Sequence, residues 1–482
     1  MNRKMIFSTL GKLTVSEAIL MIFPLIVALA YRETKSAIAF LIAIGIAAAV
    51  GFSLYFGCKT KNKIIYAKEG FIIVALGWVI MSIIGALPFV ISGDIPSYID
   101  AFFETVSGFT TTGATILRDV EILSKSGLFW RSFTHWIGGM GVLVFIMAIL
   151  PSVSDRSIHI MRAEMPGPIV GKLVPRARET ARILYIIYFA MTFAEVILLL
   201  IGKMPLYDSI VHAFGTAGTG GFGIKNDSIA SYSPYIQWVI TVFMFLFGIN
   251  FNLYYLIIIR KAKSIFKSGE LWAYIAISGV AITIICANTL HMFSSFEEAL
   301  RTSAFQVSSF ITSTGYATVN ANTWPSMSKM VLVILMFIGA CAGSTGGGFK
   351  VARIVMLYKM IKQELRRVIH PRSVTAVKFE GKTVDKTTLN SVSSYLAIYL
   401  LFFIVIIFAI SFEPFGFETN FTATLSCINN IGPIFSQVDP NVSFANYTIF
   451  SKIVLSFAML FGRLEIYPLL IALNLNTWTK NN

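Results

Sequence analysis

Long, nearly uninterrupted apolar blocks divide this sequence, and they restrict the chain to folds that lie within a lipid bilayer. A helix needs about 20 mostly apolar residues to cross the hydrocarbon core of a membrane, and most blocks reach that length with their flanks. Hydrophobic residues fill 56% of the 482 positions and charged residues only 13%, which is too apolar for a water-covered surface. We predict an all-α integral membrane protein with ten spanning helices, in the blocks 20–31, 38–55, 71–91, 142–150, 183–201, 238–259, 272–287, 330–342, 395–410 and 453–473.

The net charge of +15 is distributed unevenly between the loops. If the N-terminus lies inside, most Lys and Arg residues fall in cytoplasmic segments, as the positive-inside rule requires, and both termini face the cytoplasm. The excess of basic residues is therefore explained by the orientation of the chain in the membrane, and we expect no nucleic-acid partner. The densest basic segments are 156–182 and 350–386. Two interpretations stay open for them, a docking surface for a cytosolic subunit or contact with anionic membrane lipids.

After an N-terminal hairpin of two spans, one pattern occurs four times. An apolar span is followed by a semi-polar stretch too short to cross, a Gly- and Thr-rich segment, and another span. The aligned glycines are Gly113, Gly220, Gly315 and Gly432. Such a recurrence indicates one supersecondary unit used four times around a central pore. The predicted divisions are a transmembrane hairpin (1–66) and pore repeats at 67–155, 156–268, 269–390, which has a broken second helix and the basic loop, and 391–482.

Acidic residues stand near the start of each predicted half-helix. They are Glu104, Asp208, Glu297 with Glu298, and Glu418. One interpretation is a simple preference of carboxylates for the positive end of a helix dipole. The other, compatible with the first, is an outer vestibule that concentrates cations.

The Gly- and Thr-rich segments have the chemistry of a filter for a dehydrated monovalent cation. Backbone carbonyls replace the water around potassium in known pores, glycine permits the backbone angles that this needs, and hydroxyls add further oxygens. A single such stretch could serve helix packing alone, but four at matching places favour a filter. No charged side chain lies in any segment, and the four are not identical, so the selectivity over sodium does not follow. The candidate potassium-binding residues are Thr111, Thr112, Gly113, Thr219, Gly220, Gly221, Ser313, Thr314, Gly315, Asn430, Ile431 and Gly432.

These motifs resemble those of the Trk/Ktr/HKT superfamily of potassium transporters, and most closely its TrkH branch. The resemblance covers nearly the whole chain, and its motifs lie at 110–115, 218–223, 312–318, 429–433, 164–168 and 462–465. It implies potassium uptake through one pore per subunit, in a homodimer regulated by a cytosolic, nucleotide-binding subunit of TrkA type. It also implies a multi-pass protein of the bacterial cytoplasmic (inner) membrane. Potassium is the transported ion, and no bound cofactor is expected.

The span after the third filter segment contains five glycines between Gly339 and Gly348. Each costs about 1 kcal/mol in a helix relative to alanine, so we predict that the helix breaks there, below the filter. By the resemblance this loop is a gate across the pore, formed by Gly343, Ser344, Thr345, Gly346, Gly347 and Gly348. The alternative is a close helix crossing at small residues.

Arg463 lies within the last predicted span, where a charge is costly and indicates a function. The resemblance implies that it faces the pore beside the glycine loop and opposes the passage of potassium. An ion pair with the nearby Glu465, or a position near the helix end, is the alternative.

Other functions receive little support from the residues. A secondary transporter for organic solutes would be expected to have inverted repeats and intramembrane charges for coupling. The sequence has no nucleophile–base pair for an enzyme, and its cysteines and histidines are not spaced like metal ligands. The motif at 343–350 has the wrong spacing for a phosphate-binding loop. The motif at 218–223 formally fits the dinucleotide-binding fingerprint, but no strand precedes it and no βαβ unit surrounds it, so both interpretations are rejected. The closest alternative is a less selective potassium/sodium transporter, or an ion-coupled cation transporter, of the same superfamily.

Overall fold

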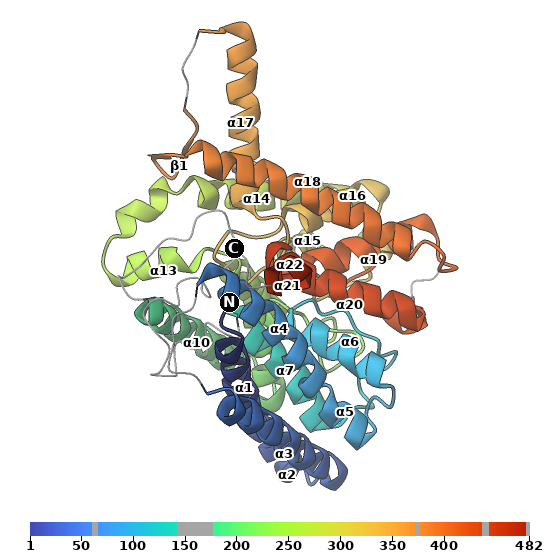
Figure 1. The fold of residues 1–482 in the computed structure, drawn as a ribbon. Helices are drawn as coiled ribbons and strands as arrows, with labels where there is room; N and C mark the ends of the chain where they lie inside the picture. The colour runs from blue at the N-terminus through green and yellow to red at the C-terminus, as the bar shows by residue number, and fades with distance from the viewer. Residues whose placement is uncertain (60–65, 142–176, 373–375, 436–442, 479–482) are drawn as a thin grey trace.

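The computed structural model describes residues 1–59, 66–141, 177–372, 376–435 and 443–478 of the chain. Nearly all of its regular structure is helical (Figure 1). The predicted span at 142–150, the motif at 164–168 and most of the basic segment 156–182 fall outside the described residues.

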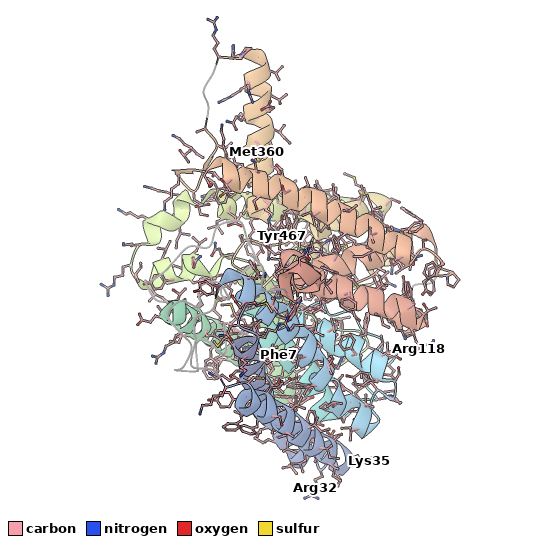
Figure 2. The ribbon with its side chains drawn as sticks, in the orientation of Figure 1. Phe7, Arg32, Lys35, Arg118, Met360 and Tyr467 are labelled. Carbon is pink, nitrogen blue, oxygen red and sulfur yellow. The ribbon has the colours of Figure 1, made fainter. Side chains whose placement is uncertain are left out.

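The N-terminal hairpin consists of α1 (Arg3–Leu20), α2 (Ile22–Ala30) and α3 (Thr34–Gly57). Two glycines bring α1 and α3 into close contact. A Cβ atom on Gly51 would lie 2.7 Å from the Val15 side chain, and one on Gly11 would lie 2.7 Å from the Gly51 carbonyl oxygen. Small residues at a helix crossing allow the backbones to approach in this way. In Figure 2, Arg32 and Lys35 of this hairpin lie at the opposite end of the molecule from Met360.

Four repeats follow the hairpin, and each contains one pore helix of 12 to 16 residues. Repeat 1 holds α4 (Ala67–Gly85), α5 (Leu87–Ser92), α6 (Tyr98–Phe109) and α7 (Lys125–Gly139). Repeat 2 holds α10 (Ala177–Ile201), α11 (Leu206–Gly218), α12 (Pro234–Phe247), α13 (Phe251–Ile258) and η1 (Ala262–Lys267). Repeat 3 holds α14 (Gly269–Thr289), η2 (Leu290–Met292), α15 (Phe296–Ile311), η3 (Ala321–Thr323), α16 (Ser326–Ile338), α17 (Val351–Ile369), and the antiparallel strands β1 (Lys378–Phe379) and β2 (Lys382–Thr383). Repeat 4 holds α18 (Lys386–Ala409), α19 (Phe417–Asn429), η4 (Phe444–Asn446), α20 (Ile449–Arg463), α21 (Tyr467–Leu473) and α22 (Leu475–Trp478).

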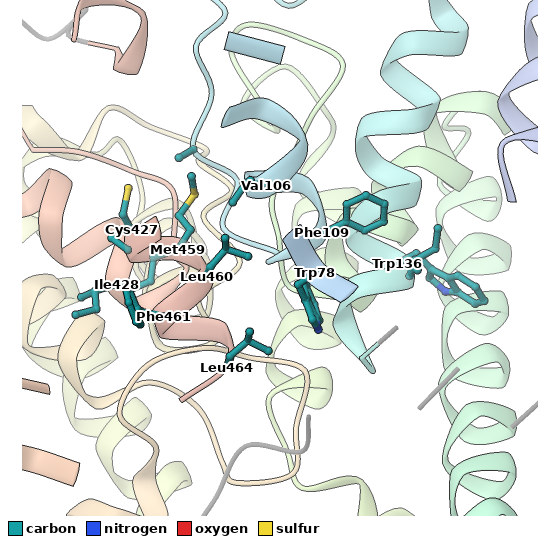
Figure 3. Close-up of a cluster of buried hydrophobic side chains, with 14 of the residues drawn as sticks. Trp78, Val106, Phe109, Trp136, Cys427, Ile428, Met459, Leu460, Phe461 and Leu464 are labelled. Atoms are coloured by element: carbon teal, nitrogen blue, oxygen red, sulfur yellow. The ribbon is translucent and has the colours of Figure 1, made fainter. Parts of the chain in front are cut away.

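The repeats form a closed ring, because the helix that follows each Gly- and Thr-rich segment packs against the pore helix of the next repeat. These contacts join α7 to α11, α12 to α15, α16 to α19, and α20 back to α6. Figure 3 shows the closure between the first and last repeats, where Val106 of α6 lies near Met459 and Leu460 of α20. Trp78 of α4 also belongs to this buried apolar cluster.

Not all ten predicted spans are long, straight helices. Six helices of the described residues are long and apolar enough to cross a bilayer, or eight if each of two bent pairs is one span. The bends are 91° between α12 and α13 and 120° between α20 and α21. Of the two remaining predicted spans, 142–150 lies outside the described residues, and 330–342 corresponds to α16, which is too short to cross alone.

The predicted break in the second helix of repeat 3 is present. α16 ends at Ile338, and α17 begins only at Val351. α17 then projects from the rest of the molecule (Figure 1). One face of this helix exposes large apolar side chains at helical spacing, namely Tyr358, Ile361, Leu365, Val368 and Ile369.

We predict that Gly51→Val destabilises the hairpin by about 1–3 kcal/mol, because the added side chain overpacks the α1–α3 crossing. Thermal denaturation in detergent, followed by size-exclusion chromatography, would measure the change in melting temperature. Gly45→Val on the same helix is the control, since a Cβ atom there meets nothing within 4 Å. Equal melting temperatures for the two variants would contradict the close crossing.

Candidate functional site

The four pore helices end in the same backbone geometry. Shortly after each helix one residue adopts the left-handed conformation, with φ between 54° and 58°: Thr111, Thr219, Ser313 and Asn430. The next residue donates its N–H to the carbonyl five positions earlier, at 2.8 to 3.0 Å: Thr112 to Ser107, Gly220 to Gly215, Thr314 to Ser309, and Ile431 to Ser426. This is the Schellman end of a helix, which usually has glycine at the left-handed position. Threonine and serine are disfavoured there by about 1–2 kcal/mol, so the local structure is held by its surroundings.

A glycine with positive φ follows two residues after each left-handed residue. These are Gly113, Gly221, Gly315 and Gly432, with φ of 77°, 74°, 82° and 99°. The predicted alignment of the second repeat on Gly220 is therefore wrong by one residue. Gly220 occupies the place of Thr112, Thr314 and Ile431. The sequence alone does not distinguish two adjacent glycines, whereas the backbone angle φ does.

These glycines bring the four filter segments together in a ring. A Cβ atom on Gly113 would collide with the carbonyl oxygen of Gly220 in the second segment. One on Gly221 would meet the Thr314 carbonyl, and one on Gly315 the Ile431 carbonyl. One on Gly432 would lie 2.8 Å from the Thr112 carbonyl oxygen, which closes the ring in chain order.

The side chains of the ring are neutral and unequal between segments. In the first segment the hydroxyls of Thr110 and Thr112 are 2.8 Å apart, and in the third those of Thr312 and Thr314 are 2.7 Å apart. Asn430 of the fourth segment donates to the Thr112 hydroxyl at 2.9 Å. All twelve predicted filter residues thus belong to the four segments of one ring, with hydroxyl pairs in only two of them.

The loop between α16 and α17, residues 339–350, packs directly against the third and fourth segments where they join their pore helices. We call these the inner ends of the segments, and the opposite ends the outer ends. The Gly347 N–H donates to the Ser313 hydroxyl at 2.5 Å, and the Gly348 N–H donates to the Asn429 carbonyl at 3.1 Å. Ser344 and Thr345 are buried in the same loop. We call residues 339–350 the glycine loop.

Arg463 joins the filter to the glycine loop, and it is buried. Its guanidinium donates to the Thr111 hydroxyl at 3.3 Å and to the Thr345 carbonyl at 3.0 Å. It also donates to the carbonyls of Gly138 and Gly139 at the end of α7, at 2.5 and 2.6 Å. The negative end of the α7 dipole therefore stabilises the charge.

Three charged residues lie at the glycine loop. Glu270 was missed by the sequence analysis, whereas Lys350 and Arg353 were counted in the basic segment 350–386; their burial is a correction to the predicted docking or lipid-contacting surface. Glu270 accepts the Ala342 N–H at 2.6 Å, and Lys350, fully buried, donates to the Gly346 carbonyl. Arg353 forms an ion pair with Glu465 at 2.6 Å. Each lies beside an apolar block or the glycine run, where a charge is costly, and this position was the available signal.

The acidic residues of the pore helices do not all occupy the predicted place. Asp208, Glu297, Glu298 and Glu418 lie in the first turns of their helices. Glu104 does not, because α6 begins at Tyr98, and its carboxylate is buried in an ion pair instead of facing a vestibule. Asp100 holds the first-turn position and forms an ion pair with Lys452 at 2.6 Å.

A cavity of about 400 Å³ opens at the outer ends of the second, third and fourth segments. Its wall includes Asp227, Gln306, Thr318 and Pro433. We call it the outer cavity. Within the described part of the chain, no group of three or more His, Cys, Asp or Glu side chains is placed to hold a metal ion.

These features define a multi-pass membrane protein with four pore repeats around one axis. Residues 36–477 match the family model of TrkH, described as a cation transport protein, and the chain belongs to this family. It is 36% identical to the Trk system potassium uptake protein TrkH of Salmonella typhimurium and 35% identical to that of Escherichia coli, over 100% of each chain. The crystal structure of the potassium transporter TrkH from Vibrio parahaemolyticus has a TM-score of 0.90 at 32% identity, covering 99% of this chain and 100% of that one. The relatives form a transport family, not a family of enzymes.

We predict that Gly221→Ala abolishes cation transport, because its φ of 74° and the Thr314 carbonyl leave no room for a methyl group. Uptake of radioactive rubidium into liposomes containing the purified protein would measure this. Gly223→Ala is the control, because a Cβ atom there would meet nothing closer than 3.7 Å. Normal uptake by the Gly221 variant would argue against the corrected alignment.

Proposed function

We propose that the chain takes up potassium across the cytoplasmic membrane through the ring of four filter segments. The observation that carries this proposal is the closed contact of each filter glycine with a carbonyl of the next segment. Carbonyl and hydroxyl oxygens without charged groups suit a dehydrated monovalent cation. The twelve ring residues would supply the potassium sites, and the names of the full-length relatives support potassium as the ion.

The unequal segments favour a second candidate, a less selective potassium/sodium or ion-coupled transporter. Repeats 1 and 3 have paired hydroxyls, whereas the fourth segment has Asn430 and Ile431. A ring of different segments need not fix one ion radius as strictly as a ring of identical ones.

Competition for rubidium uptake in liposomes distinguishes the two candidates. We expect potassium to compete about as well as unlabelled rubidium, and sodium and lithium to compete at least about tenfold more weakly, which corresponds to about 1.4 kcal/mol. A matched variant, Glu364→Gln, changes an exposed residue on α17 outside the pore helices and controls for general damage. Equal competition by sodium would exclude the selective pore and favour the second candidate.

The glycine loop and Arg463 would form the gate on the inner side of the filter. The loop contacts Ser313 and Asn429, and the guanidinium contacts Thr111, so both lie against the inner end of the ring. A positive charge there raises the energy of a cation in the pore. Movement of Gly343 to Gly348 away from these contacts would open the path.

We expect Arg463→Ala to raise rubidium flux by about tenfold, because lowering a barrier by about 1.4 kcal/mol has this effect. Arg463→Lys keeps the charge and should stay near the wild-type rate. Flux should be compared at equal amounts of reconstituted protein. Unchanged or lower flux in a well-folded Arg463→Ala protein would count against a barrier at this residue.

A homodimer under the control of a cytosolic, nucleotide-binding TrkA-type subunit completes the proposal. The relatives' names place them in a Trk system. The apolar face of α17 offers a surface for a second copy of the chain. The basic residues of the same helix, which include Arg366 and Arg367, offer a surface for a cytosolic subunit. Both termini would then face the cytoplasm, as the distribution of basic residues predicts.

A further inference from the structure

The four pore helices carry different residues at one equivalent position, seven before the left-handed residue. They are Glu104, His212, Gln306 and Ala423. Each of the three polar ones contacts the outer part of a filter segment or the loop beyond it. The nature of these contacts differs between the repeats, and only the first repeat uses charges.

In repeat 1, Glu104 holds the outer end of its own filter segment. Its carboxylate accepts the Thr115 hydroxyl at 2.9 Å and the Ile116 N–H at 3.0 Å. It also accepts the Arg131 Nε–H at 2.8 Å. Both charged side chains are almost fully buried, with exposed fractions of 0% and 2%. Hydrogen bonds to charged groups are about twice as strong as neutral ones, so this end of the segment is firmly held.

Arg131 extends the contact to the second filter segment. Its guanidinium donates to the Gly223 carbonyl at 3.4 Å and to the Thr115 hydroxyl at 3.3 Å. Its Cζ atom lies 4.0 Å from the centre of the Phe222 ring. One planar group therefore contacts the outer ends of both segments, which the fixed geometry of a guanidinium favours.

The other repeats have weaker contacts. His212 is 3.4 Å from the Tyr316 hydroxyl and 3.3 Å from that of Tyr232. Gln306 donates to the Val319 carbonyl at 3.3 Å, its Oε1 atom has no partner, and it lines the outer cavity. Ala423 has no polar side-chain atom.

The position of Arg131 is also unique to repeat 1. It lies seven residues after the N-cap Ser124 of α7. The equivalent residues of α12, α16 and α20 are apolar: Ile240, Leu332 and Leu455. The residues that line the outer cavity come from repeats 2, 3 and 4, and none comes from repeat 1.

We propose that the Glu104–Arg131 pair is a specificity-determining positioning pair, which holds the outer ends of segments 1 and 2 at a fixed separation. The pair touches no ion itself. It prevents the two segments from closing around a smaller cation, so that sodium loses more than potassium. This inference rests on the proposed function as a potassium pore.

The double variant Glu104→Gln/Arg131→Leu tests the proposal. It gives repeat 1 the residues that repeat 3 already has at both positions, Gln306 and Leu332, and leaves no unpaired buried charge. In liposomes we expect rubidium uptake to persist, while the sodium concentration that halves uptake falls about tenfold, as the loss of charge-assisted hydrogen bonds implies. Glu364→Gln, which removes one charge of an exposed ion pair with Arg367 on α17, away from the pore helices, should leave the selectivity unchanged.

Wild-type selectivity in a folded, transporting double variant would overturn the proposal. If the double variant cannot be purified in folded form, Arg131→Lys decides instead. Lysine keeps the positive charge but lacks the planar guanidinium that contacts both segments, so this variant should reduce the potassium/sodium preference by a smaller factor. An unchanged preference would overturn the proposal as well. Failure of the wild type to prefer potassium would contradict the proposed function itself, and that outcome is seen in the same assay without any variant.

Discussion

The structure depends on one contact made four times, in which a filter glycine lies against a carbonyl oxygen of the next segment. Gly113, Gly221 and Gly315 each leave no space for a Cβ atom there. Because the contacts close into a ring, the four pore helices must end at the same depth, and each helix end is fixed by the same hydrogen bond. The outer helices can then bend or break without disturbing the ring. This explains how α16 stops at Ile338 while the third filter segment keeps its shape.

The sequence predicted the repeats, the filter segments and the broken helix, because apolar periodicity and glycine clustering are local signals. It could not separate Gly220 from Gly221, since their difference is a backbone angle set by a neighbouring segment. It placed Glu104 in a vestibule because its partner, Arg131, lies 27 residues away, on another helix. The contacts of Arg463 with Thr111 and Gly138 join residues more than 300 positions apart, and no spacing rule reaches that far.

The charges buried beside the ring and the glycine loop are tolerated because they are matched by partners that are already in place. Arg463 lies at the end of α7, where unpaired carbonyls and the helix dipole are negative. Glu104 and Arg131, and likewise Arg353 and Glu465, form ion pairs with further hydrogen bonds. Removing one member of such a pair costs more than removing both, because a lone buried charge has no solvent to replace its partner.

The ring of filter segments is made by one continuous chain, not by four identical subunits. In a symmetric tetramer every codon change alters all four sides of the pore at once, and most such changes are intolerable. Here Glu104 could arise in one repeat and Ala423 in another, so each quarter of the ring can vary by itself. A substitution can therefore change one quarter of the ring while the glycine–carbonyl contacts of the other three quarters stay in place.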